Sequence, residues 1–558
     1  MPRPDAPPTD RGSRLGWKAI VLILLYGGTL LGSCLGGETR ALTYHEVIFA
    51  QPAREMLHTG DWLMTRFGGE PCTHKPPVTA WLIAASMLTA GSRAEWVVRI
   101  PAVAAALLTA LIIAALASRW YGRRVGVAAG LVQCSAYYVM MQARLAEADM
   151  ILCLWVTGAF AAFALARLRA VPPPRWLAWV FYACVGLAFM TKFLIGPAFI
   201  FGGCLAYVLV QRDWKAWRFF VSPVGWGILA VLVFTWPILA WRQYPQIWQD
   251  WWFHNIQRFT GEGKGRNQPW LFYFYMTPAL LLPWVIWLIP AVWVGLRERM
   301  FRSGRWRLIW LWLAAGMLII TASAWKGKHY VIPALPPLSI VIGWFLVRDS
   351  FEKPGRRLGL VPSTVLLVLG CIGAAVGVWV ARPEIGWEVA VIIGAAGLAL
   401  AATVWADALR RPRATLTFLF LAFWAVGVGV NCLIVRHFDV KYRHQAQFGR
   451  RLSAAVPEGK AILIFGIPEN QVAYYLRFPL ERADELPALR KKVRAEGGGT
   501  FYVTGPDDAA DELRQLGSLV EIDRGESAQQ EGARRYYVTG WRLHVAAPAT
   551  APLDADTP

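Results

Sequence analysis

Long apolar runs constrain the fold of this chain more than any other feature of its sequence. Stretches of about 20 apolar residues, the length that a helix needs to cross a bilayer, recur between residues 19 and 435. Unpaired backbone groups are too costly in lipid for anything but helices or closed barrels, and these stretches are too continuous for barrel strands. The sequence therefore predicts an α-helical polytopic membrane protein. About thirteen transmembrane helices are expected, at 19–36, 98–118, 125–142, 150–166, 176–191, 194–210, 219–240, 277–296, 308–324, 331–347, 358–380, 388–406 and 415–435.

The charged residues agree with this class and exclude others. Only 17% of the 558 residues are charged, whereas a typical soluble domain has about 25%, so an ordinary soluble enzyme and a disordered chain are excluded. The formal net charge of +21 could suggest nucleic-acid binding. Residues 436–558 contain equal numbers of basic and acidic residues, so the whole excess lies in the predicted membrane part. We therefore expect no nucleic-acid partner.

The Lys and Arg residues of the short loops predict the orientation of the helices. If the N-terminus is cytoplasmic, the basic loops at 119–124, 297–307 and 410–413 all lie inside, as the positive-inside rule requires. The apolar stretch 76–92 is short and is broken by two prolines. Counting it as a span would move the later basic loops outside, so an interfacial helix on the outer leaflet is expected. The C-terminus is then outside.

The chain divides into three predicted regions. Residues 1–435 are expected to form a transmembrane domain, with interfacial helices in a first outer loop at about 37–97. Residues 436–545 are expected to form a small soluble, extracytoplasmic α/β domain, and residues 546–558, rich in Ala, Pro and Asp, a disordered tail. The α/β assignment depends on helix-like stretches that alternate with β-rich runs. These are 485–496, 508–516, AILIFG (461–466), TFYVTG (500–505) and YYVTGW (536–541).

The eight cysteines do not predict a disulfide framework. Most of them lie inside apolar runs and have no paired spacing, so they are interpreted as small core residues rather than disulfides or metal ligands. The segment Leu31-Gly32-Ser33-Cys34 follows a basic head and an apolar run, as in a bacterial lipoprotein cleavage site. An uncleaved first span is favoured, because a further dozen predicted spans follow it.

Acidic residues stand out at the predicted outer face, since ionisable groups at membrane depth are costly and usually functional. Asp149 ends a very short loop and must lie near the lipid boundary. The loss of water around its carboxylate is costly there unless a partner pairs with it or it has a function. A structural pair with Arg144 is the plain alternative. Glu46 lies with Arg54 and Glu55 on an amphipathic stretch of the first outer loop. For Arg54 and Glu55, an interfacial helix with snorkelling charges is the favoured interpretation.

Single cations recur at the same predicted face. Lys75 precedes a Pro-Pro break, and Lys192 lies between two apolar spans. Arg258 lies in a long loop after a span, and Lys328 lies close to Tyr330. One such cation could simply snorkel to the surface, but several that converge with acids on one outer cavity indicate a site for a phosphate and a general base. The His residues show no HExxH or comparable spacing, so no designed metal site is expected.

Five segments contain motifs in a distinctive order: REM, KPP, R…D, a Lys-Gly-Pro-like segment and K…YxxP. They are 45–57 (HEVIFAQPAREML), 61–81 (DWLMTRFGGEPCTHKPPVTAW), 144–152 (RLAEADMIL), 187–197 (LAFMTKFLIGP) and 321–333 (TASAWKGKHYVIP). They resemble the bacterial 4-amino-4-deoxy-L-arabinose (lipid A) transferase family, which belongs with the protein O-mannosyltransferases to the GT-C glycosyltransferases. The resemblance covers roughly residues 15–345 and implies a GT-C-type fold.

The resemblance implies an enzyme of the bacterial inner membrane that works at the outer face of that membrane. Such an enzyme takes a sugar from a polyprenyl-phosphate carrier and attaches it to an envelope acceptor, which could be a lipid A-like lipid, a glycan or a protein. By the family pattern, Lys75, Arg258 and Tyr330 contact the carrier phosphate, and Lys192 and Lys328 are weaker matches. Fixed cations in a dry cavity stabilise the charge that builds on a departing phosphate. Membrane lipids are further partners, and the sequence gives no oligomeric state.

The resemblance also assigns two catalytic acids, Glu46 and Asp149. The family usually has Asp-Glu where this chain has His45-Glu46, so the division of roles between the two acids stays open. Two acids could hold a divalent ion, although the resemblance requires neither a metal nor another cofactor. Two further classes are weighed against the enzyme. A transporter or lipid flippase would often show repeated halves, which are not seen here, and a non-catalytic envelope scaffold would not need these residues.

Overall fold

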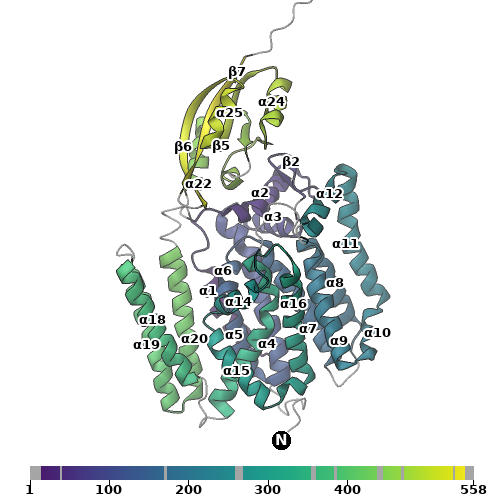
Figure 1. Cartoon of the computed structure of the whole chain (residues 1–558), viewed down its shortest axis with the longest axis vertical. Helices are drawn as coiled ribbons and strands as arrows, with labels where there is room; N and C mark the ends of the chain where they lie inside the picture. The colour runs from purple at the N-terminus through teal and green to yellow at the C-terminus, as the bar shows by residue number, and fades with distance from the viewer. Residues whose placement is uncertain are drawn as a thin grey trace, which may run out of the picture. The chain divides into compact units, whose positions relative to one another are not determined.

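The computed structural model contains two compact units, drawn as a ribbon in Figure 1. The first, called the helical unit, comprises Met1–Leu35, Thr73–Ser86 and Val98–Val435. The second, called the sheet unit, comprises Gly36–Cys72, Met87–Val97 and Arg436–Pro558, so it combines most of the predicted first outer loop with the end of the chain. The structure describes residues 14–37, 40–73, 75–168, 173–257, 260, 268–352, 360–381, 386–435, 444–466, 470–531 and 534–546. The predicted tail at 546–558 lies outside these residues, apart from Ala546. The predicted domain boundaries stay predictions.

The helical unit consists of apolar helices joined by short connections. Its longer helices are α1 (Trp17–Gly32), α4 (Glu95–Tyr121), α5 (Arg123–Ser135), α7 (Ala148–Arg167), α8 (Trp176–Lys192), α9 (Ile195–Gln211), α11 (Pro223–Gln243), α15 (Val285–Arg297), α16 (Gly304–Ala322), α17 (Pro336–Val347), α18 (Leu360–Ala381), α19 (Gly386–Ala408) and α20 (Pro412–Gly429). Shorter pieces include α6 (Tyr137–Ala143), α10 (Trp217–Phe220), α12 (Ile247–Trp252), α14 (Phe272–Leu280), η4 (Lys328–Ala334), η5 (Arg348–Glu352) and η7 (Val430–Ile434). Every predicted apolar run therefore falls on helical segments.

The number of helices that can span a membrane is smaller than predicted. Among the described residues, six helices are long and apolar enough, or up to eight if each of two bent pairs counts as one span. The predicted number of 13 is therefore not confirmed. The stretch 76–92 forms the short apolar helix α3 (Val78–Ala90), and its predicted place at the membrane surface stays a prediction.

The predicted runs at 277–296 and 331–347 are bent rather than straight. Helices α14 and α15 meet at 108°, and η4 and α17 meet at 58°. Pro283 lies between α14 and α15, where a proline cannot continue the hydrogen-bond ladder of a helix. Continuous hydropathy does not reveal such breaks, because every residue around them is apolar.

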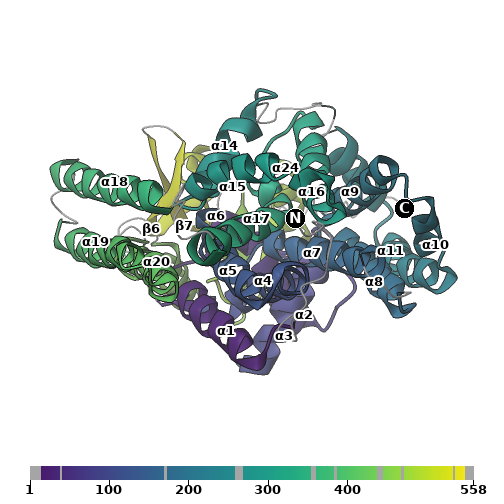
Figure 2. The ribbon, with the colours of Figure 1, turned by 90° about the horizontal axis from the view of Figure 1, so that it is seen from below.

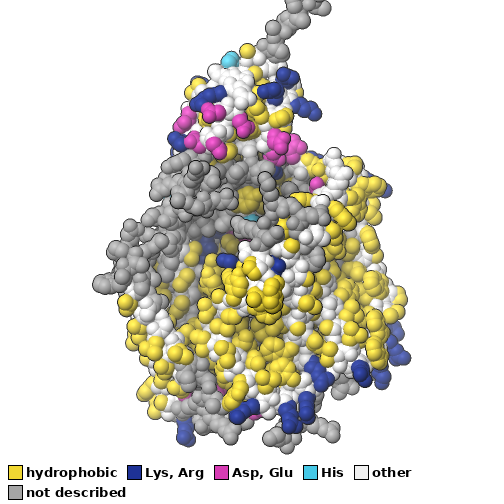
Figure 3. Space-filling model, in the orientation of Figure 1, with side chains coloured by type: hydrophobic (Ala, Val, Ile, Leu, Met, Phe, Trp, Pro, Cys, Tyr) yellow, Lys and Arg dark blue, Asp and Glu magenta, His cyan; other side chains and the backbone are white. Residues whose placement is uncertain are grey.

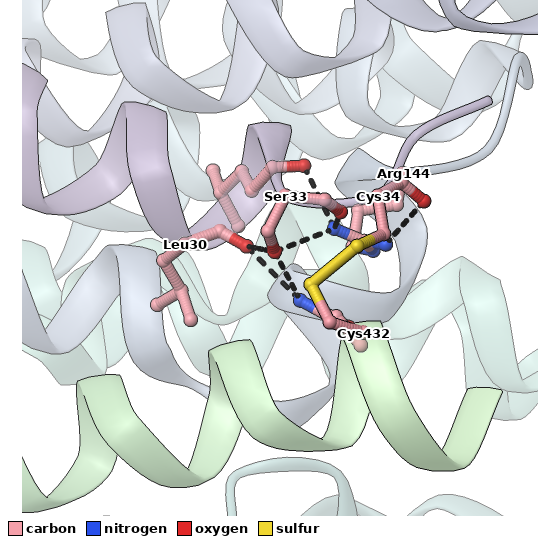
Figure 4. The surroundings of a disulfide bond; sticks show 7 residues. Leu30, Ser33, Cys34, Arg144 and Cys432 are labelled. Atoms are coloured by element: carbon pink, nitrogen blue, oxygen red, sulfur yellow. Dashed lines mark hydrogen bonds between the residues drawn. A yellow bond between two sulfur atoms is a disulfide. The ribbon is translucent and has the colours of Figure 1, made fainter. Parts of the chain in front are cut away.

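A disulfide joins the first helix of the helical unit to its last. Cys34 follows α1 and is bonded to Cys432 in η7, which continues α20, and their Cα atoms are 5.5 Å apart (Figure 4). The prediction that the cysteines form no disulfide is wrong for this pair, since partners separated by 398 residues leave no local spacing to recognise. A sulfur that forms a disulfide cannot also hold a lipid, so the lipoprotein interpretation of Cys34 is excluded in this state.

Two polar side chains surround the disulfide with hydrogen bonds. Arg144, which caps the C-terminus of α6 and is 1% exposed, donates to the carbonyl oxygens of Leu31 at 3.1 Å and Cys34 at 3.2 Å (Figure 4). Asn431 donates from Nδ2 to the carbonyl oxygen of Leu30 at 3.0 Å. The last carbonyls of a helix have no partner within it, so these bonds satisfy the end of α1. They also fasten the short loop that precedes α7 to the disulfide.

Exposed Lys and Arg side chains gather at the opposite end of α1, and Figure 3 shows a row of them along one end of the helical unit. They belong to the first turns of α1, α5 and α20 and to the connections after α9 and α15. We call the following exposed basic residues of these segments the basic row: Lys18, Arg123, Arg124, Lys215, Arg218, Arg302 and Arg413. The disulfide and the basic row therefore mark the two ends of the same helices.

The sheet unit contains a five-stranded sheet with the order β4-β3-β5-β7-β6. Strand β3 pairs in parallel with β4 and β5, and β7 pairs antiparallel with β5 and β6. The strands are β3 (Ile462–Phe465), β4 (Leu480–Ala483), β5 (Gly499–Pro506), β6 (Ser518–Glu531) and β7 (Arg534–Val545). The three predicted β-rich runs are β3, β5 and β7, and the predicted helices are α24 (Leu486–Ala495) and the turn that includes α25 (Ala510–Arg514).

The core of this sheet is apolar and is covered by those two helices. Phe465 and Trp541 of the strands are buried together with Leu489 of α24 and Leu513 of α25. Burying the apolar face of a sheet against helices is the usual way to build a small α/β domain. The predicted small C-terminal α/β domain is therefore confirmed in kind.

Helix α2 (Tyr44–Thr59) is held in the sheet unit by two buried charged residues. Arg54, 7% exposed, donates to three carbonyl oxygens of residues 473–476 at 2.6 to 3.3 Å. Glu55, 4% exposed, accepts from the backbone N–H groups of Gly68 at 2.6 Å and Gly69 at 3.1 Å. The interpretation of these two residues as snorkelling surface charges is wrong, because backbone groups of the same unit bind both of them.

Candidate active site

Asp149 and Lys192 form a buried ion pair in the helical unit. The ammonium Nζ of Lys192 donates to Oδ1 of Asp149 at 2.6 Å, and the two side chains are only 9% and 6% exposed. Asp149 lies in the first turn of α7, and Lys192 is the last residue of α8, which packs against α7. A carboxylate is stabilised at a helix N-terminus and an ammonium at a C-terminus. Both helices therefore favour the charges that they present to each other.

A third element, η4, brings an aromatic ring to this pair. The Lys192 ammonium lies 4.7 Å from the centroid of the Tyr330 ring, within the distance of a cation–π interaction. The neighbouring His329 packs edge-on against Tyr330, with ring centroids 4.5 Å apart. Asp149 interacts electrostatically with Lys192, His329 and Lys75. One carboxylate thus interacts with cationic and aromatic groups from three other segments.

The position of η4 depends on hydrogen bonds from three other helices. Trp312 of α16 donates from Nε1 to the carbonyl oxygen of Pro333 at 3.0 Å. The Tyr273 hydroxyl of α14 donates to the carbonyl oxygen of Gly327, the residue before η4, at 3.1 Å. The Cys153 thiol of α7 lies 3.7 Å from the carbonyl oxygen of Ile332. Sequence reasoning missed these supporting residues, since side chains that bind a distant backbone carbonyl have no spacing signal.

Lys75 is half-buried and follows a segment that is tied to α12. The hydroxyl of Thr73, two residues earlier, forms a hydrogen bond with a carboxylate oxygen of Asp250. Thr73 is 1% exposed, so this bond fixes the chain just before the Pro-Pro break. Sequence reasoning missed Asp250 as well, although it lies among tryptophans, a residue type that is enriched at membrane–water interfaces.

The remaining predicted site residues are Lys328, Arg258 and Glu46. Lys328 begins η4 and is exposed. Arg258 lies outside the described residues. Glu46 belongs to the sheet unit, where it is fully buried in the first turn of α2. There the Glu46 carboxylate accepts from the backbone N–H of Thr43 at 2.8 Å, and the Thr43 hydroxyl accepts from the N–H of Glu46, which together form a capping box.

The predicted pair of Asp149 with Arg144 is replaced by the pair with Lys192. The guanidinium of Arg144 instead donates to carbonyl oxygens at the end of α1. Within the described part of the chain, no three His, Cys, Asp or Glu residues gather as metal ligands would. What the helical unit brings together is an acid with cations, an arrangement suited to binding a phosphate and to moving or holding a proton.

Comparison of the sequence with protein families and curated proteins gives consistent matches. Residues 74–241 match the family described as dolichyl-phosphate-mannose-protein mannosyltransferase. The chain is 28% identical over 493 residues to the undecaprenyl phosphate-alpha-4-amino-4-deoxy-L-arabinose arabinosyl transferase of Edwardsiella ictaluri, covering 84% of this chain and 85% of that protein. It is 30% identical over 361 residues to the enzyme of the same name from Pseudomonas savastanoi pv. phaseolicola, covering 62% and 66%.

Comparison of the folds leads to the same group of proteins. The crystal structure of ArnT from Cupriavidus metallidurans bound to undecaprenyl phosphate superposes with a TM-score of 0.76 at 19% identity, covering 93% of this chain and 97% of that one. The same protein in the apo state gives a TM-score of 0.73 at 20% identity. The fold class and the resemblance that the motifs predicted are both confirmed.

Proposed function

We propose a specific reaction for this chain, a membrane glycosyltransferase that uses a lipid-linked donor. It takes 4-amino-4-deoxy-L-arabinose, or a closely similar sugar, from undecaprenyl phosphate and attaches it to a lipid A-like acceptor. The relatives that cover most of the chain are named for that donor. A related fold binds undecaprenyl phosphate. The reaction takes place at the outer face of the bacterial inner membrane.

Two separate features support this orientation. The disulfide between Cys34 and Cys432 needs an oxidising compartment, which lies outside the cytoplasm. The basic row lies at the other end of α1 and α20, where the positive-inside rule expects the cytoplasm. Arg144 fastens the loop before Asp149 to the disulfide end of α1. Asp149 therefore faces the outer side, and the N-terminus is cytoplasmic.

The ion pair of Asp149 and Lys192 is the observation on which the proposed chemistry rests. Transfer breaks the bond between the sugar C1 and the phosphate oxygen, whose electrons remain on the phosphate. Lys192 and Lys75 supply positive charge for that phosphate in a low-dielectric site. When Lys192 turns from Asp149 to the phosphate, the carboxylate becomes available to accept the proton of the acceptor hydroxyl. Binding of the donor and activation of the acceptor are then coupled through one side chain.

The roles of the remaining predicted residues are proposed from the family pattern. Glu46 is the second acid, Arg258 is a further cation for the carrier phosphate, and Tyr330 contacts that phosphate beside Lys192. Lys328 is exposed at the start of η4 and is the weakest of these assignments. If the acceptor group is itself a phosphate, no strong base is needed, and Asp149 and Glu46 orient the sugar instead.

The test compares Asp→Asn changes in two ion pairs, one at each end of α7. Asp149→Asn removes the acid of the site. Asp213→Asn instead breaks the ion pair with Arg167, in the last turn of the same helix, whose guanidinium lies 2.6 Å from the Asp213 carboxylate. Both variants are assayed in proteoliposomes with undecaprenyl-phosphate-linked sugar and lipid A, and the product is measured by mass spectrometry.

We expect Asp149→Asn to lower the transfer rate at least about 100-fold, the usual contribution of a general acid or base. Asp213→Asn should lower thermal stability and leave the rate per folded molecule within a few-fold of the native value. Equal rates for the two variants would refute the role of Asp149. Lipid or solute movement by the native protein without detectable sugar transfer would instead favour a transporter or flippase.

A further inference from the structure

A cavity of about 760 Å³ lies at the end of the helical unit where three of its helices begin. The helices are α1, α5 and α20, which contact one another and lie side by side in Figure 2. Apolar side chains from all three and from α17 line its inner part, and they include Leu22, Val127, Leu131, Val347, Leu416 and Phe420. None of the residues assigned to sugar transfer lines this cavity. It is therefore a separate feature of the fold, and it has the apolar walls that a hydrocarbon chain requires.

The entrance of the cavity is strongly basic. Lys18, Arg123, Arg124 and Arg413 belong to its lining, and no acidic residue is among the lining residues, all of which lie in the described part of the chain. The Arg124 guanidinium stacks over the ring of Phe351, 4.4 Å from its centroid, which holds one of these charges in place. Four cations around one apolar cavity favour an anionic ligand.

The helix ends add to this charge. Helix α1 has 16 residues, α5 has 13 and α20 has 18, and each begins at this cavity. A helix N-terminus presents free N–H groups and a partial positive charge, which favour a bound phosphate. The cations and the helix ends thus point to the same kind of ligand, an anionic head group attached to an apolar tail.

We propose that this cavity binds one anionic glycerophospholipid of the membrane. Its phosphate lies among the four cations, and an acyl chain lies along the apolar walls between α1, α5 and α20. Basic pockets between helices at the cytoplasmic side suit anionic lipids, and the proposed orientation puts this end of the helices there. A carrier lipid has the same chemistry, but it reacts at the other end of α1, beside Asp149. The bound phospholipid fastens α20 to the rest of the helical unit, at the end opposite the disulfide.

The test measures lipid binding to the purified full chain in detergent by native mass spectrometry. Dioleoyl phosphatidylglycerol is titrated against dioleoyl phosphatidylcholine, which has the same chains and no net charge. The variant Arg124→Gln/Arg413→Gln removes two cations of the cavity. The matched control, Lys215→Gln/Arg218→Gln, removes two exposed cations of the same basic row that do not line the cavity.

We expect one tightly bound phosphatidylglycerol per native chain, with phosphatidylcholine at least tenfold weaker. The cavity variant should bind phosphatidylglycerol about 30-fold more weakly, roughly fivefold for each cation, and the control variant should bind it like the native chain. Equal losses in the two variants, or equal binding of the two lipids, would overturn the proposal.

A second measurement needs no variant and therefore does not depend on folding of the mutants. Phosphatidylglycerol with a photoactivatable acyl chain is cross-linked to the native protein in liposomes, and the labelled peptides are identified. Label should appear in α5 around Leu131 and in α20 around Leu416. Displacement of that label by an equal amount of undecaprenyl phosphate would show a carrier-lipid site instead. Displacement by millimolar inorganic phosphate would show a simple anion site, and label confined to other helices would reject the cavity.

Discussion

Arg54 and Glu55 of the sheet unit and Asp149 and Lys192 of the helical unit are all buried, but different groups satisfy the charges of these two pairs. In the sheet unit, Arg54 donates to three backbone carbonyls, and Glu55 accepts from two backbone amides. In the helical unit, Lys192 and Asp149 satisfy each other, under the ring of Tyr330. A charge that is bound by backbone groups is fixed by the fold. A charge that is bound by another side chain can exchange its partner for a ligand, so the pair of Asp149 and Lys192 is the one suited to chemistry.

The largest effect should come from breaking the side-chain pair in two ways. Lys192→Met leaves the Asp149 carboxylate buried without its partner, which should cost about 3 to 5 kcal/mol of stability. The double variant Asp149→Asn/Lys192→Met removes both charges and should recover most of that stability. Sugar transfer should be lost by at least about 100-fold in both variants. Thermal unfolding in detergent and the proteoliposome assay measure the two quantities separately.

If the double variant recovered transfer along with stability, the pair would be structural, and the contrast between the two units would fail. If Lys192→Met lost transfer without any loss of stability, another cation would pair with the Asp149 carboxylate in place of Lys192. His329 and Lys75 both interact with Asp149, so the double variants of Lys192 with each of them would identify which one replaces it.

The next effect concerns the backbone-bound charge. Arg54→Met leaves three carbonyl oxygens of residues 473–476 without their donor, and an unsatisfied buried polar group costs about 1 to 3 kcal/mol. The sheet unit should therefore lose about 3 kcal/mol of stability. Transfer per folded molecule should change much less than in the Asp149 variants. Arg451→Met, which removes an exposed ion pair with Asp523 in the same unit, serves as the control and should have little effect. If Arg54→Met lost transfer activity while keeping full stability, Arg54 would have a role in the reaction itself.

The disulfide should have a smaller effect on the helical unit. Replacing both Cys34 and Cys432 by Ser removes the covalent link between α1 and η7, and a typical disulfide stabilises by about 2 to 4 kcal/mol. Hydrogen bonds of Arg144 and Asn431 still hold the same helix end, so we expect a loss near the lower value. The melting temperature in detergent, with and without reductant, measures it. A native protein that is insensitive to reductant, with free thiols at both positions in isolated membranes, would contradict the outer location of this helix end.

The sequence predicted the class of fold because hydropathy is a local signal, and it predicted strands β3, β5 and β7 for the same reason. Strands β4 and β6 both lie at the edges of the sheet. They were missed because their sequences, LERA and SLVEIDRGESAQQE, contain many polar residues and lack the apolar run that identified β3. The predicted topology did place Cys34 and Cys432 on the same side of the membrane. Pairing them would have required the knowledge that α1 and α20 are neighbours, which no local pattern gives.

The candidate site shows the same limit. Asp149 and Lys192 were predicted on one face because each lies at the end of an apolar run. Their hydrogen bond could not be predicted, since it depends on how α7 packs against α8 and on η4 lying over Lys192. The positions of Arg54 and Glu55 were misjudged for a related reason, because their partners are backbone groups that any sequence would supply.

The smallest effect should separate the two parts of Tyr330. Tyr330→Phe keeps a ring over the Lys192 ammonium and removes the hydroxyl, whereas Tyr330→Leu removes both. A cation–π contact contributes about 0.5 to 2 kcal/mol, so Tyr330→Leu should lower transfer several-fold to about 30-fold if the ring positions Lys192. If the ring positions Lys192, Tyr330→Phe should keep a transfer rate near the native value. Measuring kcat and the KM for the donor in both variants then decides between the ring and the hydroxyl. A Phe variant as slow as the Leu variant, with a raised KM for the donor, would instead assign the hydroxyl to the carrier phosphate. Lys192 would then be held ready by Asp149 alone.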